Sequence, residues 1–294
     1  LDESEIERIG SIVMDSYTSD KESRAEWESM FEKGFELLGL KLNTTSEPFE
    51  GACTAVHPLL IESAVKFQSK ASEELFPPQG PVKAQIIGTS NAQKEDQSER
   101  VQSFMNFQLT EVMPEYFDEF ERMLFHLPLV GSAFKKIYYD PASERPVSEF
   151  VPVDQFYVSY NATDLRRADR YTHVIYMTPH ELQKQIMSGM YRDIDLSEPG
   201  NFQPSTMSQT INSIMGIEFN AEHDKQYTLL EQHLYLELDD DEFPSPYIVT
   251  IEKDSGQVLG IRRNWNENDP TREKKMYFTH YKYVPGFGFY GLGL

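Results

Sequence analysis

The stretch GSAFKKIYYDP, residues 131–141, is the point at which the pattern of apolar residues changes along the chain. Before it, apolar residues recur three and four positions apart, which indicates amphipathic helices. From Gly131 onward they recur every second position, which indicates strands. We therefore predict an α+β fold: a helical portion over residues 1–130 and a portion of antiparallel strands with some helix over residues 131–294. The N-terminal helical layer should pack on the mostly antiparallel sheet region.

The helical portion is divided by capping residues and prolines. Ser19 and Glu22 have the spacing of a capping box, so a second helix is predicted to begin there. Pro114 is expected to separate two later helices. The predicted elements are a helix over Ile6–Tyr17, a second from Ser19 to Gly39, a polar loop over 40–55, a helix from Pro58 to Leu75 with a long buried stripe, a strand over Val82–Ile87, and helices over Val101–Val112 and 115–127.

The second portion is predicted to consist mainly of strands joined by short turns. Residues 196–222 are polar and rich in Ser, Asn and Gln, so a long loop or excursion is predicted there. The other predicted elements are a hairpin of 132–139 with 147–151 across Asp140–Ser143, a strand over 171–177, a helix from Thr178-Pro179 to about Met187, a strand over Leu230–Leu238, a hairpin of 246–252 with 257–264, and a last strand over 276–284.

The chain is strongly acidic. It has 27 Lys and Arg against 48 Asp and Glu, a formal net charge of −21. Binding to a phosphate backbone requires clustered Lys and Arg, so this composition argues against a protein that grips nucleic acid. The single cysteine, Cys53, excludes a disulfide within the chain and fits a reducing compartment. No apolar run approaches the roughly 18 residues of a membrane helix, so no membrane partner is predicted.

Signatures of catalysis and metal binding are scarce. The sequence has no Walker phosphate loop, no Gly-x-Ser-x-Gly elbow and no His-Glu-x-x-His. Cys53 precedes His57 by four residues, but nothing holds a base against the sulfur, so a packed cysteine is favoured over a nucleophile. The acidic run Asp239–Glu242 lacks the alternating ligands and the glycine of a calcium loop, so a solvated turn is favoured. No catalytic, cofactor-binding or metal-binding residue is assigned.

One glycine pattern resembles a cofactor motif. Gly286, Gly288 and Gly291 match Gly-x-Gly-x-x-Gly after the strand-like Tyr281–Val284. A dinucleotide site needs a following helix and an acid about 20 residues later. The given sequence ends three residues after Gly291, and bulky aromatic residues stand between the glycines. The pattern therefore favours an aromatic loop that packs or turns, and no cofactor is predicted.

Carboxylates and aromatic residues leave a second function open. Glu73-Glu74 and Glu119/Glu121 fall on faces that the helical period predicts to be exposed. Whether two carboxylates meet in space, as acid–base hydrolysis needs, does not follow from spacing. An acidic hydrolase whose carboxylates converge only in the fold is therefore an alternative. The abundant Phe and Tyr are interleaved with acids, which favours core and subunit interface over base stacking.

Four segments follow one another in an order that carries more information than the composition does. They are HPLLIESAVKFQSKASEELFPPQGPVKAQIIG (57–88), GSAFKKIYYDP (131–141), FVPVDQFYVSYNATDLRRADRYTHVIYMTPHELQKQIMSGMY (150–191) and FTHYKYVPGFGFYGLGL (278–294). Their succession resembles the portal, or head-to-tail connector, of tailed bacteriophages, most like the short-tailed type. The similarity covers nearly the whole chain, and the block over 150–191 is its most specific part.

The resemblance implies a structural subunit and not an enzyme. Portals form rings, usually of twelve subunits, at one capsid vertex of the virion, and they assemble in the host cytoplasm. Double-stranded DNA passes through the channel without specific binding, driven by a separate terminase. The other implied partners are the major capsid protein, the scaffold and the tail adaptor. In similar proteins Phe-Tyr-Gly-Leu-Gly precedes the stem, so this chain resembles an N-terminal, wing-rich portion without stem, clip or crown.

The acidic charge and the aromatic content of the chain both agree with this resemblance. A negative, weakly interacting channel wall would let DNA slide, which agrees with the acidic composition. A ring also needs large lateral interfaces, which would use the aromatic residues. Another virion module, such as a tail adaptor or a scaffold-binding domain, is a third hypothesis, and the amount of lateral interface in the assembled particle would separate it from a portal.

Overall fold

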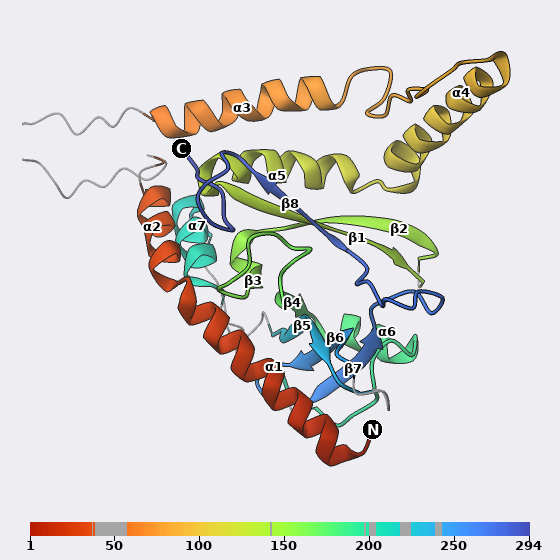
Figure 1. Cartoon of the computed structure of the whole chain (residues 1–294). Coiled ribbons are helices and arrows are strands. Elements are labelled where there is room, and N and C mark those ends of the chain that lie inside the picture. The colour runs from red at the N-terminus through yellow and green to blue at the C-terminus, as the bar shows by residue number, and fades with distance from the viewer. Residues whose placement is uncertain are drawn as a thin grey trace, which may run out of the picture. The chain divides into compact units, whose positions relative to one another are not determined.

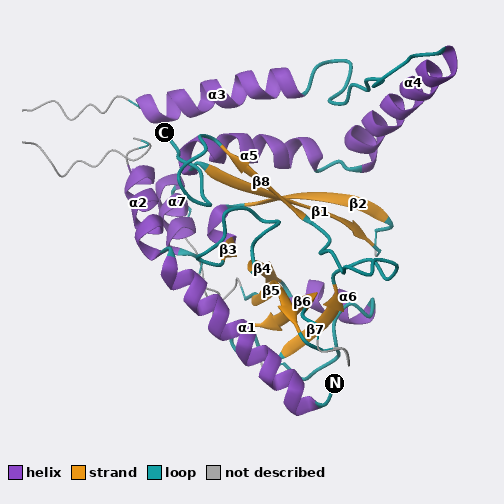
Figure 2. Ribbon diagram, viewed as in Figure 1, coloured by secondary structure: helices purple, strands orange, loops and turns teal. Residues whose placement is uncertain are grey.

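The computed structural model describes residues 1–36, 38, 58–141, 143–196, 198–199, 204–217, 225–238 and 243–294. The fold is α+β, as predicted, with helices and two antiparallel sheets (Figures 1 and 2). Most of the described helices precede residue 130 and all of the described strands follow it. The chain nevertheless folds into two compact units with other bounds, because the N-terminal helices belong to the same unit as the strands of residues 156–263. Unit 1 consists of Leu1–Pro58, Val153–Met276 and Gly286–Phe289, and unit 2 of Leu59–Pro152, Tyr277–Pro285 and Tyr290–Leu294.

Unit 1 is built on a five-stranded antiparallel sheet of order β3-β4-β5-β6-β7. The predictions of strands over 171–177, 246–252 and 257–264 and of a helix after Thr178 are confirmed. The elements of unit 1 are the helices α1 (Glu3–Ser23), α2 (Ala25–Glu36), α6 (Pro179–Met187) and α7 (Thr206–Met215), the short 3-10 helix Val153–Gln155, and the strands β3 (Phe156–Val158), β4 (Tyr171–Met177), β5 (Tyr227–Leu236), β6 (Ser245–Glu252) and β7 (Val258–Arg263).

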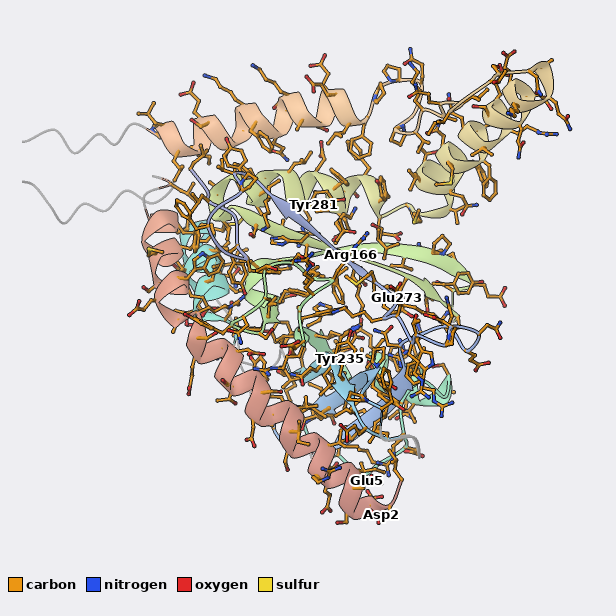
Figure 3. The ribbon with its side chains drawn as sticks, viewed as in Figure 1. Asp2, Glu5, Arg166, Tyr235, Glu273 and Tyr281 are labelled. Carbon is orange, nitrogen blue, oxygen red and sulfur yellow. The ribbon has the colours of Figure 1, made fainter. Side chains whose placement is uncertain are left out.

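Helix α1 packs on one face of this sheet through a buried stripe. Asp2 caps the helix by accepting a hydrogen bond from the Glu5 backbone N–H at 2.7 Å (both residues are labelled in Figure 3). The stripe follows the helical period, so the same side of α1 meets the sheet on each turn. The core of this face comprises Ile9, Val13 and Tyr17 of α1 with Tyr157, Val174, Leu230, Leu234, Val249, Ile251 and Val258 of the strands.

The predicted helix start at Ser19 is wrong, because α1 continues through it to Ser23. Asp20, on the buried side of this turn, accepts hydrogen bonds from Arg170 at 2.7 and 2.9 Å. This buried pair fixes the turn in the helix, so the local capping signal is overridden. The break comes at Arg24, which separates α1 from α2.

The polar stretch 196–222 is not wholly a loop, so that prediction is wrong for residues 206–215. They form α7, which Ser205 caps by accepting a hydrogen bond from the Ser208 N–H at 3.1 Å. Gly216 ends the helix with a φ of 71°. Met207 is buried, and α7 packs against α2. One apolar contact face and two good caps therefore suffice for a helix of polar composition.

Unit 2 combines three helices with a three-stranded antiparallel sheet of order β2-β1-β8. The predicted hairpin, the last strand and the break at Pro114 are confirmed. The elements are α3 (Leu59–Leu75), α4 (Ala92–Phe107), the π-helical turn Gln108–Val112, α5 (Tyr116–Val130), β1 (Ser132–Asp140), β2 (Arg145–Val151) and β8 (Phe278–Lys282).

The core of unit 2 lies between α5 and the sheet, with α3 packed along α5 (Figure 1). The predicted stripe of α3 is only partly buried: Ala64 is fully buried, whereas Leu75 is 44% exposed. Phe67 and Ala71 are partly buried against the core. The core residues are Phe120, Met123, Leu124 and Leu127 of α5, Ala133 of β1 and Phe150 of β2.

The glycines near the end of the given sequence allow two backbone segments to touch. Gly131 ends α5 with a φ of 81°, and a Cβ there would lie 2.4 Å from the carbonyl carbon of Leu292. A Cβ on Gly291 would lie 2.2 Å from the Gly131 oxygen. No helix follows Gly286, Gly288 or Gly291 within the described residues 286–294. The arrangement is that of a loop that packs, as the sequence favoured.

Candidate interaction surface

Helix α4 presents an apolar surface that the described part of the chain does not cover. None of its residues is buried. It extends away from the paired helices α3 and α5 (Figure 1). We call its exposed apolar side chains the α4 face: Val101 (48% exposed), Phe104 (60%), Met105 (40%) and Phe107 (54%). Large apolar side chains that gather on one unburied helix mark a contact surface.

Local hydrogen bonds stabilise α4, although none of its side chains is buried in a hydrophobic core. Asn91 caps it by accepting a hydrogen bond from the Lys94 N–H at 2.8 Å. The opposite side of α4 binds the preceding segment through two amide side chains. Asn106 Oδ1 accepts from the Val82 N–H at 2.8 Å, and Gln102 Oε1 accepts from the Ala84 N–H at 3.0 Å. The α4 face therefore has a defined orientation relative to this segment.

These contacts overturn the predicted strand at residues 82–87. The segment has no strand partner among the described residues and forms no β-strand. Amide side chains of α4 bind the segment where a neighbouring strand would have been expected. Gly80, whose φ is 100°, leads the chain closely past the Asn106 side chain. A Cβ at Gly80 would meet that amide at 2.5 Å.

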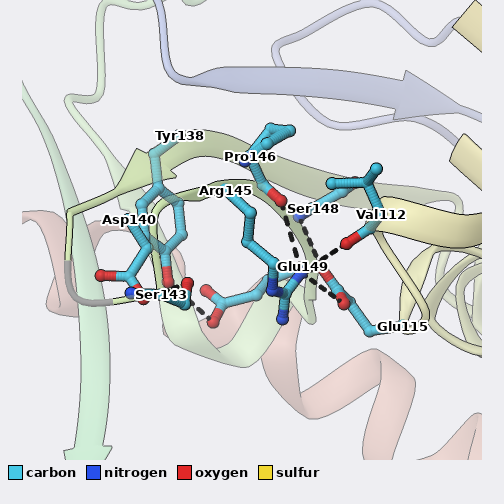
Figure 4. Close-up of polar contacts among 9 residues, drawn as sticks. All are labelled: Val112, Glu115, Tyr138, Asp140, Ser143, Arg145, Pro146, Ser148 and Glu149. Carbon is cyan, nitrogen blue, oxygen red and sulfur yellow. Dashed lines mark hydrogen bonds and ion pairs between the residues drawn. The ribbon is translucent and has the colours of Figure 1, made fainter. Parts of the chain in front are cut away.

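A hydrogen-bond network around Arg145 anchors the base of α4 to the sheet (Figure 4). Its guanidinium donates to both carboxylate oxygens of Glu115 at 2.8 Å and to the Pro146 carbonyl at 3.3 Å. It also reaches the Val112 carbonyl, at the end of the π-helical turn, at 3.5 Å. Burial alone would raise the pKa of Glu115, but Arg145 and the neighbouring N–H groups lower it below its usual value.

Two carboxylates, one just before α5 and one in its first turn, cover the outer edge of β2. Glu115 accepts from the Ser148 N–H at 3.4 Å, and Glu119 accepts from the Phe150 N–H at 2.7 Å. The prediction that Glu119 and Glu121 are exposed is therefore wrong: the Glu119 side chain is only 19% exposed, and both residues are half-buried. Because these oxygens already accept hydrogen bonds, they serve structure and are poorly placed as general acids.

Unit 1 contains a hollow between α1 and the β6–β7 turn that bears on the hydrolase alternative. Glu3, Glu7, Asp15 and Asp254 line it. All four carboxylates are exposed. A carboxyl group needs burial or a close like charge to become a general acid near neutral pH. This hollow lacks the buried carboxylate pair that the alternative requires.

The remaining sequence candidates are not brought together in a site. Cys53, His57 and Asp239–Glu242 lie outside the described residues. Within the described ranges, no three His, Cys, Asp or Glu side chains gather as a metal site would require. The sequence did not single out Arg145, Asn106 or the exposure of the α4 face. Its only signal for the face was the apolar period of residues 101–112, which also fits a buried helix.

Comparison with known proteins gives no information on the role of this surface. No protein-family model matches the chain, and no curated protein is significantly similar to it. None of the helices in the described ranges is long and apolar enough to cross a membrane.

Proposed function

We propose that this chain is a structural subunit of a ring-shaped phage portal, the conduit for DNA packaging and ejection at one capsid vertex. The proposal combines the succession of portal-like segments with one structural observation, the α4 face. In this proposal the neighbouring copy in the ring covers that face. The ring then contacts the capsid protein and scaffold outside, the terminase during packaging and the tail adaptor afterwards.

The α4 face supports a subunit because its exposure is unfavourable for a free molecule. Burying a large apolar side chain completely contributes roughly 1.5–3 kcal/mol. Four half-exposed side chains on one helix therefore leave several kcal/mol to be gained by contact with another molecule. Ring assembly provides such a contact at every subunit, since each copy offers the same surface to its neighbour.

The charge of the chain supports a conduit that does not hold DNA. The net charge of −21 repels a phosphate backbone. An acidic hydrolase would use carboxylates as catalysts, but Glu115 and Glu119 are already engaged by backbone N–H groups and arginine side chains. The structural role therefore fits the described residues better.

Electron microscopy of negatively stained particles tests the proposal. The intact natural polypeptide should form rings, and the double variant Phe104→Asp/Met105→Asp should remain monomeric because two charges would be buried at the contact. Met187→Asp is the matched control, since Met187 of α6 is 79% exposed and outside the α4 face; its rings should persist. Monomers of the wild-type polypeptide under assembly conditions would overturn the portal proposal. Rings of the double variant would overturn only the role of the α4 face.

A further inference from the structure

Lys135 is a buried lysine without a hydrogen-bond partner, in the core of unit 2. It lies on β1 and is 1% exposed. Its Nζ donates no hydrogen bond to any group of the described chain. Two rings of α5 face it instead: Nζ lies 4.3 Å from the ring centre of Tyr116 and 4.6 Å from that of Phe120. The ammonium has exchanged its water shell for two aromatic faces.

The nearby carboxylates compensate this charge only partly. Glu119 of α5 and Glu115, the residue just before α5, are the acids that attract the Lys135 ammonium. Glu115 is held by Arg145 of β2, and Glu119 is paired with Arg122 and with a β2 backbone N–H. Both acids therefore already have charged or N–H partners. A buried charge without direct hydrogen bonds weakens the structure that contains it.

The residues paired with Lys135 across the sheet, and the ring packed against Phe120, are uncharged. Tyr281 of β8 (labelled in Figure 3) lies edge-on to Phe120, with ring centres 6.1 Å apart. Across the sheet, Lys135 is paired in register with Phe150 of β2 and Thr279 of β8. Burial raises the pKa of Tyr116 and of Tyr281, so both phenols stay neutral up to alkaline pH.

We propose that Lys135 is a built-in pH-dependent weak point of unit 2, whose protonation loosens the contact between α5 and the three-stranded sheet and whose deprotonation tightens it. This property is independent of the proposed portal function. It makes the helix that leads from α4 into the sheet easier to open near neutral pH than at mildly alkaline pH.

The direction of the effect follows from the pKa of the amine. Burial lowers the pKa of Lys135 from 10.5 to about 8, while the charges of Glu119 and Glu115 oppose the fall. In the unfolded chain the amine keeps its ordinary pKa, so folding disfavours the proton. The destabilisation is fully present below pH 8 and is relieved as pH rises from about 8 toward 10.5.

Hydrogen exchange of α5 and β1 amides, corrected for the intrinsic exchange rate, measures this contact. Between pH 7 and 9 the protection of these amides in the wild type should rise by on the order of 10-fold. Lys135→Met, which fills the same space without a charge, should be more protected at pH 7 and should show no such rise. Lys136→Met, the same change one residue along β1, should keep the rise.

An equal rise in Lys135→Met and wild type would overturn the proposal. A direct titration keeps the test decisive if the methionine variant does not fold. The ¹³Cε signal of Lys135 in the wild-type protein should titrate with a midpoint near pH 8, well below the ordinary lysine pKa of 10.5. A midpoint at the ordinary lysine value would equally overturn the proposal, because the amine would then carry no folding penalty.

Discussion

Helices α1 and α4 begin with the same local device and differ in what they bury. Asp2 caps α1 and Asn91 caps α4, each by accepting a backbone N–H hydrogen bond. Helix α1 then buries an apolar stripe against a sheet, whereas α4 buries no residue. The comparison shows that caps set where a helix starts, while burial decides what it contributes. The apolar side chains of α1 stabilise its own unit, and those of α4 are available to a partner.

The largest expected contrast is between two arginine–aspartate pairs. Arg170 pairs with Asp20, which is 1% exposed, whereas Arg100 pairs with Asp96 on α4, where both side chains are about two-thirds exposed or more. Arg170→Met leaves a buried carboxylate uncompensated and should lower the free energy of unfolding by about 2–4 kcal/mol. Arg100→Met should change it by less than about 0.5 kcal/mol. Urea unfolding followed by circular dichroism measures both, and equal losses would contradict the contrast.

The same substitution, valine to alanine, can be made on a buried position of α1 and on an exposed position of α4. Val13 of α1 is fully buried, and Val101 of α4 is 48% exposed. Val13→Ala should cost roughly 2 kcal/mol, because it removes buried methyl groups and leaves a cavity. Val101→Ala should lie within about 0.5 kcal/mol of the wild type in the unassembled chain. Both tryptophans, Trp27 and Trp265, belong to unit 1, so their fluorescence reports the Val13 effect. The Val101 effect is measured by urea unfolding followed by circular dichroism, which detects the helices of both units. An equally large effect at Val101 would show that α4 is covered within the chain.

The segment before α4 is expected to depend on one amide. Asn106 both accepts from the Val82 N–H and donates to the Val82 carbonyl, at 2.8 and 3.1 Å. Asn106→Ala should cost about 1 kcal/mol locally and expose residues 82–87 to proteolysis. Gln97→Ala, on an exposed position of the same helix, is the control. Unchanged cleavage rates in Asn106→Ala would show that the segment is held by other contacts.

The smallest expected effect is a response to acid at the base of α4. The pKa of Glu115 is lowered in the folded state, so its contribution to stability is complete above its ordinary pKa and is lost as pH falls through the lowered value. Hydrogen exchange of the Met113 amide, which bonds to the Gln108 carbonyl, should accelerate in that range. Glu115→Gln should remove the pH dependence. A wild-type amide that exchanges equally at pH 3 and 5, after correction for intrinsic rates, would contradict this role.

Local sequence signals predicted the regular elements well because those signals act within the element. Thr178 and Glu181 form the capping box that starts α6, and the alternation over 171–177 coincides with β4. Predictions failed where a distant contact decided the outcome. Asp20 keeps α1 helical through Ser19 by binding Arg170, and no local rule contains that contact.

The candidate surface was only half predictable for the same physical reason. The sequence shows the helical spacing of apolar residues in α4, but this spacing is the same whether the apolar face is buried or exposed. The amide side chains that bind residues 82–84 come from 18 to 24 positions later in the chain. Lys135 occupies a strand position that alternation assigned correctly, yet its burial beneath α5 depends on packing.

Oxidative footprinting of Met105 tests the central claim, that a neighbouring copy covers the α4 face. Hydroxyl radicals would be applied to the assembled natural polypeptide and to its dissociated monomer, with the 79% exposed Met187 as internal reference. Met105 should be protected in the assembly and oxidised in the monomer, while Met187 should be oxidised in both. Equal oxidation of Met105 in the two states would contradict the account.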